Sequence, residues 1–239
     1  MKRAGEKKSN KFALLFAAIV AIVVIVAGFL FFNPFSGKTS NATKKAASSG
    51  SSSSTQAVKY EPSQEEKDYL KNRFDQLTAV NPEAIAYVYA PGTELDEPVV
   101  QTGDNATYLD KTFDGGNEPY MGTVFMDTDN KKDFSDRFTW LFGHARGSKV
   151  GDHRMFNDVN YYDKQEYFDQ HPYVVIETPE RKYYYEAMCL VIVPETTAFY
   201  RTSFEDDKDF TTQLKKVYED GQTKNPNIKI KASDKYLVL

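Results

Sequence analysis

Few residues of this chain are obvious candidates for catalysis: the 239-residue sequence contains three histidines and one cysteine. His144 ends the stretch "FTWLFGH" and precedes the polar stretch "ARGSKVGDHR", so it lies where a strand becomes a loop. A histidine in such a place can exchange protons near neutral pH and can meet both a substrate and a nucleophile. A loop histidine is often only structural, however. We interpret His153 as a solvated loop residue and His171, which precedes Pro172, as a turn residue.

The single cysteine, Cys189, would be the obvious nucleophile, but its surroundings favour a position in the core. It lies in the long apolar stretch "YYYEAMCLVIV". With the two-residue period of a strand, it shares a face with Tyr185, Ala187, Val191 and Val193. On an apolar face the thiolate is disfavoured, and cysteine behaves as a small hydrophobic residue. A catalytic role for Cys189 stays open as an alternative, and one cysteine excludes an internal disulfide.

Patterns for metal or cofactor binding are weak. "DTDNKKD" (Asp127–Asp133) has spaced carboxylates, but it lacks the glycine and the terminal glutamate of a calcium-binding loop. We interpret it as a solvated turn. The sequence contains no CxxC or HExxH motif and no glycine loop that would cradle phosphate. We therefore predict no metal site and no cofactor.

The charge is unevenly spread along the chain, and this limits the class of partner. The net charge is −4, and since residues 1–11 and residues 33–59 each sum to +4 and residues 12–32 are uncharged, residues 60–239 carry −12. An acidic body argues against nucleic acid as a partner. Hydrophobic residues make up 41% of the chain and aromatic residues 14%, which is enough for a real core with a bias toward β structure.

The N-terminal part predicts a membrane anchor and a tether. Phe12–Phe32 are uncharged and apolar, and as a helix they would span a hydrocarbon core of about 30 Å. The basic residues of the tail, residues 1–11, predict that this end stays in the cytoplasm. A cleaved signal peptide is the alternative, but its apolar region usually has only about 7–15 residues. Residues 33–59 are rich in Ser, Lys and Ala and predict a disordered linker.

Residues 60–239 predict one globular, mainly β body. Ser63-Gln-Glu-Glu66 is a capping-box pattern that opens a helix to about Leu77. Phe204–Gly221 predict a second helix, because three apolar residues repeat there at helical spacing before a glycine. Turn signals separate the predicted strands, which are Ile85–Tyr89, Glu97–Gln101, Gly122–Met126, Phe138–Phe142, Tyr173–Glu177, Lys182–Val193, Ile228–Lys231 and Tyr236–Leu239. Many short strands with few helices favour a closed or nearly closed β-barrel.

These features resemble class B sortases, the membrane-anchored cysteine transpeptidases of Gram-positive bacteria. The resemblance rests on segments in family order, "AYVYAPGTELDEPVVQTGDNATYL", "FDGGNEPYMGTVFMD", "WLFGHARGS", "MFNDVNYYDKQEYFDQHPYVVIETPERKYYYE" and "TTAFYRTSFEDDKDFTTQL". It runs from about Tyr60 to the chain's end, and the helix between the sixth and seventh strands, here Phe204–Gly221, is the class B signature. The resemblance implies an eight-stranded β-barrel with an N-terminal helix, its last strand missing here. We expect that loss to leave the backbone of the neighbouring strands exposed.

The resemblance implies a catalytic set of His, Cys and Arg, of which the histidine corresponds to His144. The family Cys closes a T-L-x-T-C motif at the end of the seventh strand. "DKYLVL" resembles the approach to this motif, with Val238 and Leu239 in place of its T-L. The Cys is expected three residues after Leu239 and the Arg on the next strand, both beyond this chain's end. For substrate binding the resemblance suggests Asn105, Leu109, Thr196 and Tyr200, with ordinary barrel packing or loop structure as the alternative for each.

The resemblance implies cleavage of a C-terminal sorting motif of surface proteins through a Cys thioester, and transfer to an amine of peptidoglycan or of a pilin. The domain, residues 60–239, would lie outside the cell on a single-pass anchor in the cell membrane. Without the Cys and the Arg we expect the chain as given to be inactive, through a premature stop, a frameshift or an incomplete gene record. The alternative is a non-catalytic, membrane-tethered module that still binds the sorting peptide. The sorting motif and the choice between cell-wall anchoring and pilus assembly stay open.

Overall fold

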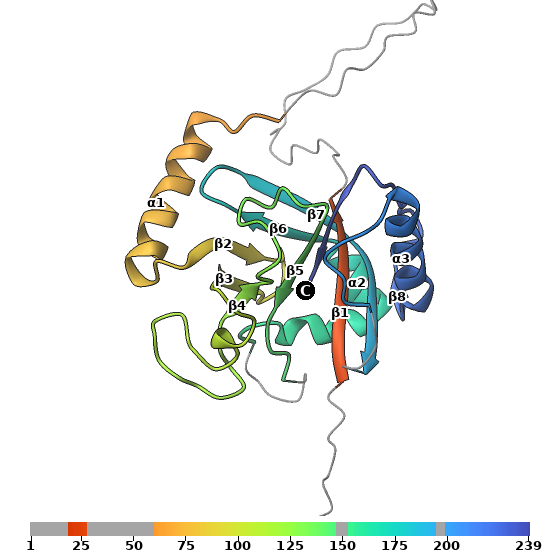
Figure 1. Ribbon diagram of the computed structural model, residues 1–239, viewed down its shortest axis with the longest axis horizontal. Coiled ribbons are helices and arrows are strands. Elements are labelled where there is room, and N and C mark those ends of the chain that lie inside the picture. Colours follow the sequence, from red (N-terminus) through yellow and green to blue (C-terminus); the bar gives the residue numbers. More distant parts are fainter. Residues whose placement is uncertain (1–18, 28–59, 147–152, 195–198) are drawn as a thin grey trace, which may run out of the picture.

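The computed structural model describes residues 19–27, 60–146, 153–194 and 199–239, the first range by its backbone alone. In these ranges the protein is mainly β, as the sequence predicts, with helices at the sides of one sheet (Figure 1). The strands are β1 (Ile19–Ala27), β2 (Ala84–Tyr89), β3 (Asp96–Val100), β4 (Val124–Met126), β5 (Phe138–Phe142), β6 (Tyr173–Glu177), β7 (Lys182–Pro194), β8 (Thr223–Lys224) and β9 (Lys235–Val238). The helices are α1 (Gln64–Val80), α2 (Gln165–Gln170) and α3 (Asp207–Asp220), with 3-10 helices η1 (Thr107–Leu109) and η2 (Asn157–Asp163).

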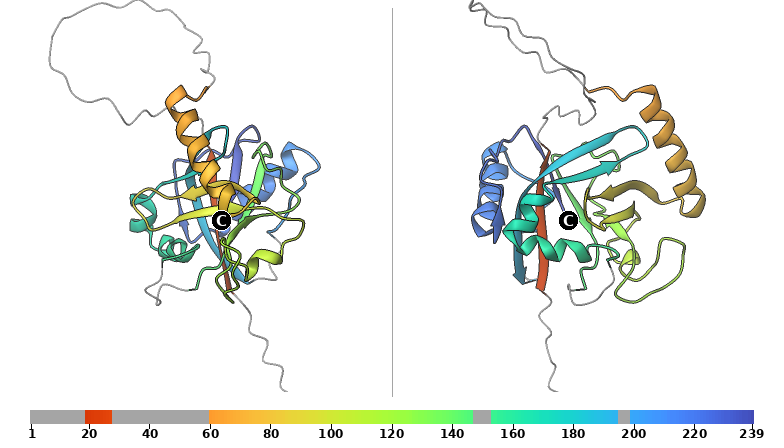
Figure 2. Two further views of the ribbon diagram at one scale, coloured as in Figure 1. Left: turned by 90° about the vertical axis from the view of Figure 1, so that its left-hand side faces the viewer. Right: turned by 180° about the vertical axis from the view of Figure 1, so that it is seen from behind.

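The nine strands form one sheet that curls on itself. Their order is β1-β9-β5-β4-β3-β2-β6-β7-β8, and β1 also pairs with β7, so the curl brings distant strands together. The views from the side and from behind show the same curl (Figure 2). Strand β9 pairs in parallel with β5, so the chain reaches Leu239 in the middle of the sheet (Figure 1).

The apolar residues of the sheet fill two main cores, one on each side of β5. Leu141 belongs to the larger core, together with the inward residues of β2, β4 and β7. Phe138 and Trp140, which alternate with it along the strand, belong to a second core beneath α3. Strand β5 therefore carries apolar side chains on both faces and is anchored in both cores, which fixes the position at which the residues after it begin.

Helix α1 begins where the capping box predicts and ends one turn later than expected. The Ser63 hydroxyl accepts a hydrogen bond from the Glu66 amide (3.1 Å), which caps the first turn. The helix continues to Val80, and the Asn81 backbone amide closes it by donating a hydrogen bond to the Leu77 carbonyl. A buried acid fastens it to the sheet, because Glu177 of β6 pairs with Arg73 of the helix (3.0 Å).

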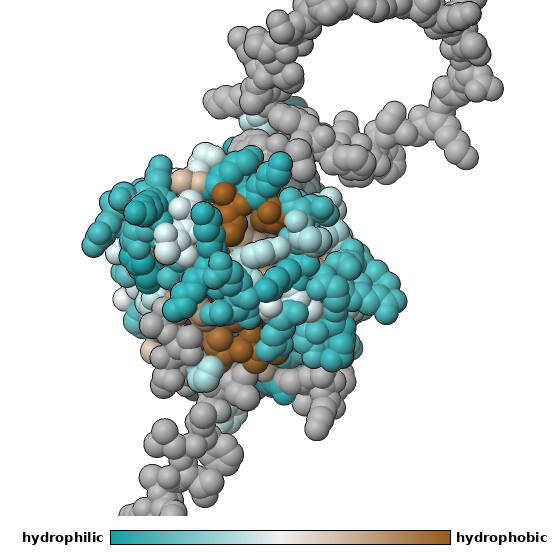
Figure 3. Space-filling view, turned by 90° about the vertical axis from the view of Figure 1, so that its right-hand side faces the viewer, coloured by the Kyte–Doolittle hydropathy of each residue, from teal (hydrophilic) through white to brown (hydrophobic). Residues whose placement is uncertain are grey.

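Helix α3 confirms the prediction for the segment between β7 and the last strand. Asp206 caps it by accepting from the Asp209 amide (2.7 Å). Its buried residues, Phe210, Leu214 and Val217, cover the second core. The face of the molecule that carries this helix is largely hydrophilic, with small hydrophobic areas (Figure 3).

Two parts of the body differ from the sequence-based expectation. Ile228–Lys231 do not form the predicted strand but lie in a loop; its apolar residues pack against the second core without a strand partner. Pro226, which has no amide hydrogen, interrupts the approach to this loop, and the pairing with β7 is made earlier, by β8. In addition, η2 and α2 occupy residues 157–170, where the sequence reasoning predicted no helix.

Strand β1 is the largest correction. The sequence predicts a membrane helix over Phe12–Phe32, whereas the described part, Ile19–Ala27, is a strand antiparallel to both β7 and β9. It is rich in Ile and Val, whose branched side chains suit a strand as well as an apolar helix. Its position satisfies the backbone of two strands that would otherwise have open edges.

The other N-terminal predictions lie outside the described residues. These are the tail (1–11), the linker (33–59) and the remaining residues of the predicted anchor, 12–18 and 28–32. None of the helices within the described ranges combines the length and the hydropathy of a membrane span.

Candidate active site

His144 lies just beyond the end of β5 and is held by a neighbouring segment. Its Nε2 lies 2.8 Å from the Leu109 carbonyl oxygen. A carbonyl only accepts, so Nε2 carries the hydrogen of this bond. The ring is half-buried and its own carbonyl accepts from the Phe156 amide (3.1 Å). The ring of His144 is thus oriented through Nε2, and Nδ1 does not take part in this bond.

Gly143 lets the chain that leads to His144 pass close to the Phe156 ring. A Cβ on this residue would lie 3.0 Å from Cδ2 of the buried Phe156 ring, closer than side chains normally approach. The segment that carries Leu109 has a similar constraint, since Gly122 has φ +62° and a Cβ there would lie 2.1 Å from the Tyr108 carbonyl oxygen. Glycines therefore allow both segments of the histidine contact to pack closely.

Leu109, one of the predicted substrate-binding residues, ends η1 and lies beside His144. The residue is 41% exposed, although it is large and apolar. Its carbonyl makes the contact with the histidine ring. The structure therefore brings Leu109 and His144 together, with the leucine side chain available to a ligand.

Asn105 and Tyr200, two further predicted binding residues, meet at one carboxylate. The Tyr200 hydroxyl donates to Asp127 Oδ2 (2.6 Å), and Asn105 Nδ2 donates to the same oxygen (3.0 Å). Partial burial and the hydrogen bond to Asp127 raise the pKa of Tyr200 above its usual value, so the phenol stays protonated. Sequence reasoning missed Asp127, which it placed in a solvated turn. Thr196 lies outside the described residues.

Aromatic rings connect Tyr200 to β5, the strand that precedes His144. The Tyr200 ring centroid lies 5.3 Å from that of Trp140 and 6.2 Å from that of Phe142. Trp140 and Phe142 are stacked (6.2 Å, interplanar angle 18°). The Trp140 indole N–H donates to the Arg201 carbonyl (2.8 Å), which fixes the loop next to Tyr200. Trp140 and Phe142 alternate along β5, and His144 follows two residues after its end.

Cys189 lies in the second core, as predicted. Its side chain has no exposed surface, and burial raises the pKa of its thiol to about 12. Its Sγ lies 3.9 Å from the Val217 carbonyl oxygen of α3. A thiol with these properties is poorly suited to nucleophilic attack.

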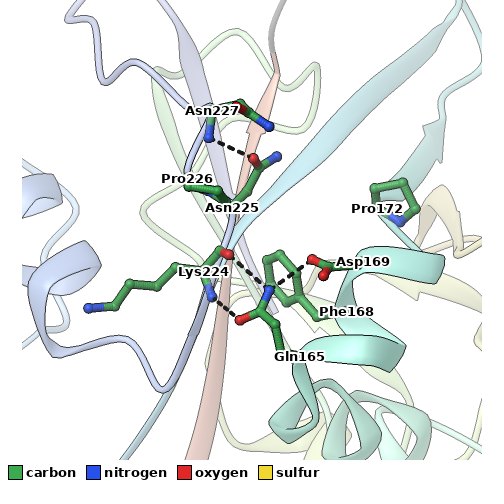
Figure 4. Close-up of a pocket in the computed structure, with 8 residues that line it drawn as sticks. All are labelled: Gln165, Phe168, Asp169, Pro172, Lys224, Asn225, Pro226 and Asn227. Carbon is green, nitrogen blue, oxygen red and sulfur yellow. Dashed lines mark hydrogen bonds between the residues drawn. The ribbon is translucent and has the colours of Figure 1, made fainter.

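A surface hollow of about 560 Å³ lies elsewhere, between α2 and the segment after β8. Gln165 bridges its two sides, donating to the Lys224 carbonyl (3.0 Å) and accepting from the Lys224 amide (3.1 Å) (Figure 4). None of the predicted site residues lines this hollow. We interpret it as a structural junction, because its polar groups are paired with one another.

Comparisons with known proteins agree on one family. No protein-family model matches the chain. Sortase B of Staphylococcus aureus is 25% identical over 173 residues, covering 72% of this chain and 68% of that protein. Sortase B of Listeria monocytogenes is 26% identical over 172 residues, covering 71% and 67%. A solved Staphylococcus aureus sortase B–substrate complex has the same fold, with a TM-score of 0.64 and 24% identity over 70% of this chain and 74% of that chain. These relatives support a class B sortase as the family of this chain.

Proposed function

We propose that this chain is the sorting-peptide-binding body of a class B sortase, in which His144 serves a cysteine transpeptidation. The reaction would begin with attack of a Cys thiolate on a backbone carbonyl of the sorting motif, which forms a thioester and releases an amine. An amine of peptidoglycan or of a pilin would then displace the thiolate and form the new amide. His144 would protonate the leaving amine and deprotonate the entering one.

The observation that carries this proposal is the parallel pairing of β5 with β9. Phe138 faces Tyr236, Thr139 faces Leu237 and Trp140 faces Val238, a constant offset of 98 positions. If β9 continues in this register, position 242 comes opposite His144. That is the position, three residues after Leu239, at which the family resemblance expects the Cys. Two independent arguments, strand register and motif spacing, therefore point to the same place.

Cys189 supports the proposal by being unsuitable for the reaction. It is buried beneath α3 with a raised pKa, whereas His144 lies at the end of β5 beside Leu109. We therefore expect the 239-residue chain itself to leave a substrate uncleaved. The proposed partners are surface proteins with a sorting motif and an amine acceptor, and the proposed place of action is the outer face of the cell membrane.

A second function, binding of the sorting peptide without catalysis, is favoured by a separate observation. Asn105, Leu109 and Tyr200 are held in place by contacts that need no nucleophile. The chain as given would then bind a peptide and leave it intact.

Mass spectrometry can test both functions. The 239-residue chain and a version extended to place a cysteine at position 242 are incubated with the substrate of the Staphylococcus aureus complex. We expect an acyl-enzyme mass only in the extended chain, and its loss in an extended His144→Ala variant. An acyl-enzyme or cleaved product from the 239-residue chain would contradict the proposed place of the nucleophile. Binding without an adduct in the extended chain would favour the non-catalytic function.

A further inference from the structure

Asp127 is a fully buried carboxylate directly after β4, and it accepts hydrogen bonds from three segments. Its exposed fraction is 0%. Oδ2 accepts from Tyr200 and from Asn105, and Oδ1 accepts from the Asp129 amide (2.8 Å). The two side-chain donors are 73 and 22 residues away along the chain. We propose that Asp127 is a positioning residue of the peptide-binding cleft, which fixes Tyr200 and Asn105 in the orientation that meets the substrate.

The burial of a charge at this place needs a reason. A buried carboxylate is costly unless hydrogen bonds satisfy it, and no Lys or Arg of the described residues forms an ion pair with Asp127. Its satisfaction therefore comes from the three donors, which belong to the loop before η1, the turn after β4 and the loop after β7. An apolar residue could fill the same space, but it could not join these segments. The carboxylate acts as a joint between them.

The geometry of Asn105 is determined by two contacts that agree. Nδ2 donates to Asp127, while Oδ1 accepts from the Thr128 amide (3.0 Å). Exchanging the oxygen and the nitrogen would break both bonds, so only one orientation of the amide fits. The second N–H of Nδ2 does not take part in the bond to Asp127 and can donate to a peptide carbonyl. Asp127 thus decides which groups of Asn105 face a ligand.

Tyr200 is fixed at its hydroxyl while its ring stays accessible. The residue is 47% exposed, and its ring lies against Trp140 and Phe142. While its hydroxyl donates a hydrogen bond to Asp127, the ring covers the aromatic residues of β5, and its outer face stays available to a ligand. Without this bond the ring could rotate away from β5, and the aromatic surface that it forms with Trp140 and Phe142 would be lost.

The inference rests on the proposed function, and a first experiment tests it without any ligand. Trp140 is the single tryptophan of the sequence and lies against Tyr200, so its fluorescence reports the position of this ring. In the full chain we expect Asp127→Asn to shift the Trp140 emission, Tyr200→Phe to shift it as well, and the double variant to add no further shift. Asp133→Asn removes a charge in the same loop after β4, where the exposed Asp133 side chain accepts from the Ser135 amide, and it should leave the emission unchanged. An unchanged emission in Asp127→Asn, or additive shifts, would overturn the inference.

A second experiment measures affinity for the substrate of the Staphylococcus aureus complex by titration calorimetry. Because hydrogen bonds to a charged group are the strong ones, we expect Asp127→Asn to weaken binding about tenfold, and the control Asp133→Asn to change it less than about twofold. Tyr200→Phe should weaken substrate binding by the native chain, but it should weaken binding little further in the Asp127→Asn background. If Asp127→Asn does not fold, Asn105→Ala and Tyr200→Phe in the native chain decide: non-additive losses are expected, and additive losses overturn the inference.

The two experiments separate the inference from the proposed function. A native chain that does not bind the substrate contradicts the function, while the Trp140 emission still decides whether Asp127 fixes Tyr200. A native chain that binds, together with an Asp127→Asn variant that folds and binds equally well, overturns the positioning role and leaves the function intact.

Discussion

At the scale of single residues, the reactivity of Cys189 follows from its burial. Burial raises the pKa of the thiol from 9.0 to about 12. Because the thiolate is the reactive form, we expect the folded chain at pH 8 to react with a chromogenic disulfide reagent about 1,000-fold more slowly than an exposed thiol. Unfolding in guanidinium chloride should release one reactive thiol per chain.

The matched reference is Ser135→Cys in a Cys189→Ser background, since position 135 is exposed in the same protein. Comparable rates for the folded native chain and this reference would show that Cys189 is accessible as a thiolate. In that event Cys189 would return as a candidate nucleophile.

Single residues also show how much of the candidate site could be predicted from the sequence. His144 could be chosen because it follows a strand, and Asn105, Leu109 and Tyr200 because their segments resemble a known family. Asp127 could not be chosen from the sequence, because a solvated turn and a turn with a buried, hydrogen-bonded carboxylate have the same local composition. What distinguishes them is the contact with Tyr200, 73 residues later, which no local pattern contains.

At the scale of elements, an ion pair ties α3 to the loop that carries Tyr200. Arg201 binds Asp209 with both guanidinium nitrogens (2.8 and 2.5 Å), and this hydrogen bonding lowers the pKa of Asp209 from 3.8 to about 2. A lowered pKa stabilises the fold above pH 3.8, and this contribution is lost as the pH falls through the range from 3.8 to about 2. We expect Asp209→Asn to lower the thermal midpoint at pH 7, with the difference from the native chain vanishing over that range.

Circular dichroism melting curves at stepped pH measure this difference. Asp220→Asn makes the same charge change at the other end of α3, and its thermal midpoint should follow that of the native chain with pH at a constant difference. A parallel curve for Asp209→Asn would instead mean that the pair contributes nothing to stability, as for many exposed ion pairs.

Elements with a local signal could be predicted, and elements that depend on distant partners could not. Helices α1 and α3 have caps and helical apolar spacing, and the sequence predicted both within about a turn. The loop over Ile228–Lys231 has the composition of a strand but finds no strand partner. Strand β1 was predicted as a helix and is a strand. Its apolar residues suit a membrane helix, and only the pairing with the distant strands β7 and β9 distinguishes the two structures.

At the scale of the whole molecule, strand β1 can be distinguished by experiment from the membrane helix that the sequence predicts for the same segment. In the sheet, Val24 is the register partner of Cys189 on β7. In the membrane helix that the sequence predicts, Val24 would lie in the hydrocarbon core, away from residues 60–239. The two arrangements therefore differ in whether position 24 can approach the only cysteine of the chain.

Val24→Cys turns this difference into a measurement. Register partners on antiparallel strands lie about 4.5–5.5 Å apart at Cα, which is within the range of a disulfide. If β1 closes the sheet, the full chain should form an intrachain disulfide under mild oxidation, seen as two lost thiols and a faster band on a non-reducing gel. Val23→Cys, whose register partner is Leu190, is the matched control and should keep its thiols free. Free thiols in both variants, with the chain recovered from the membrane fraction, would mean that this segment anchors the protein. The edges of β7 and β9 would then be open to another strand.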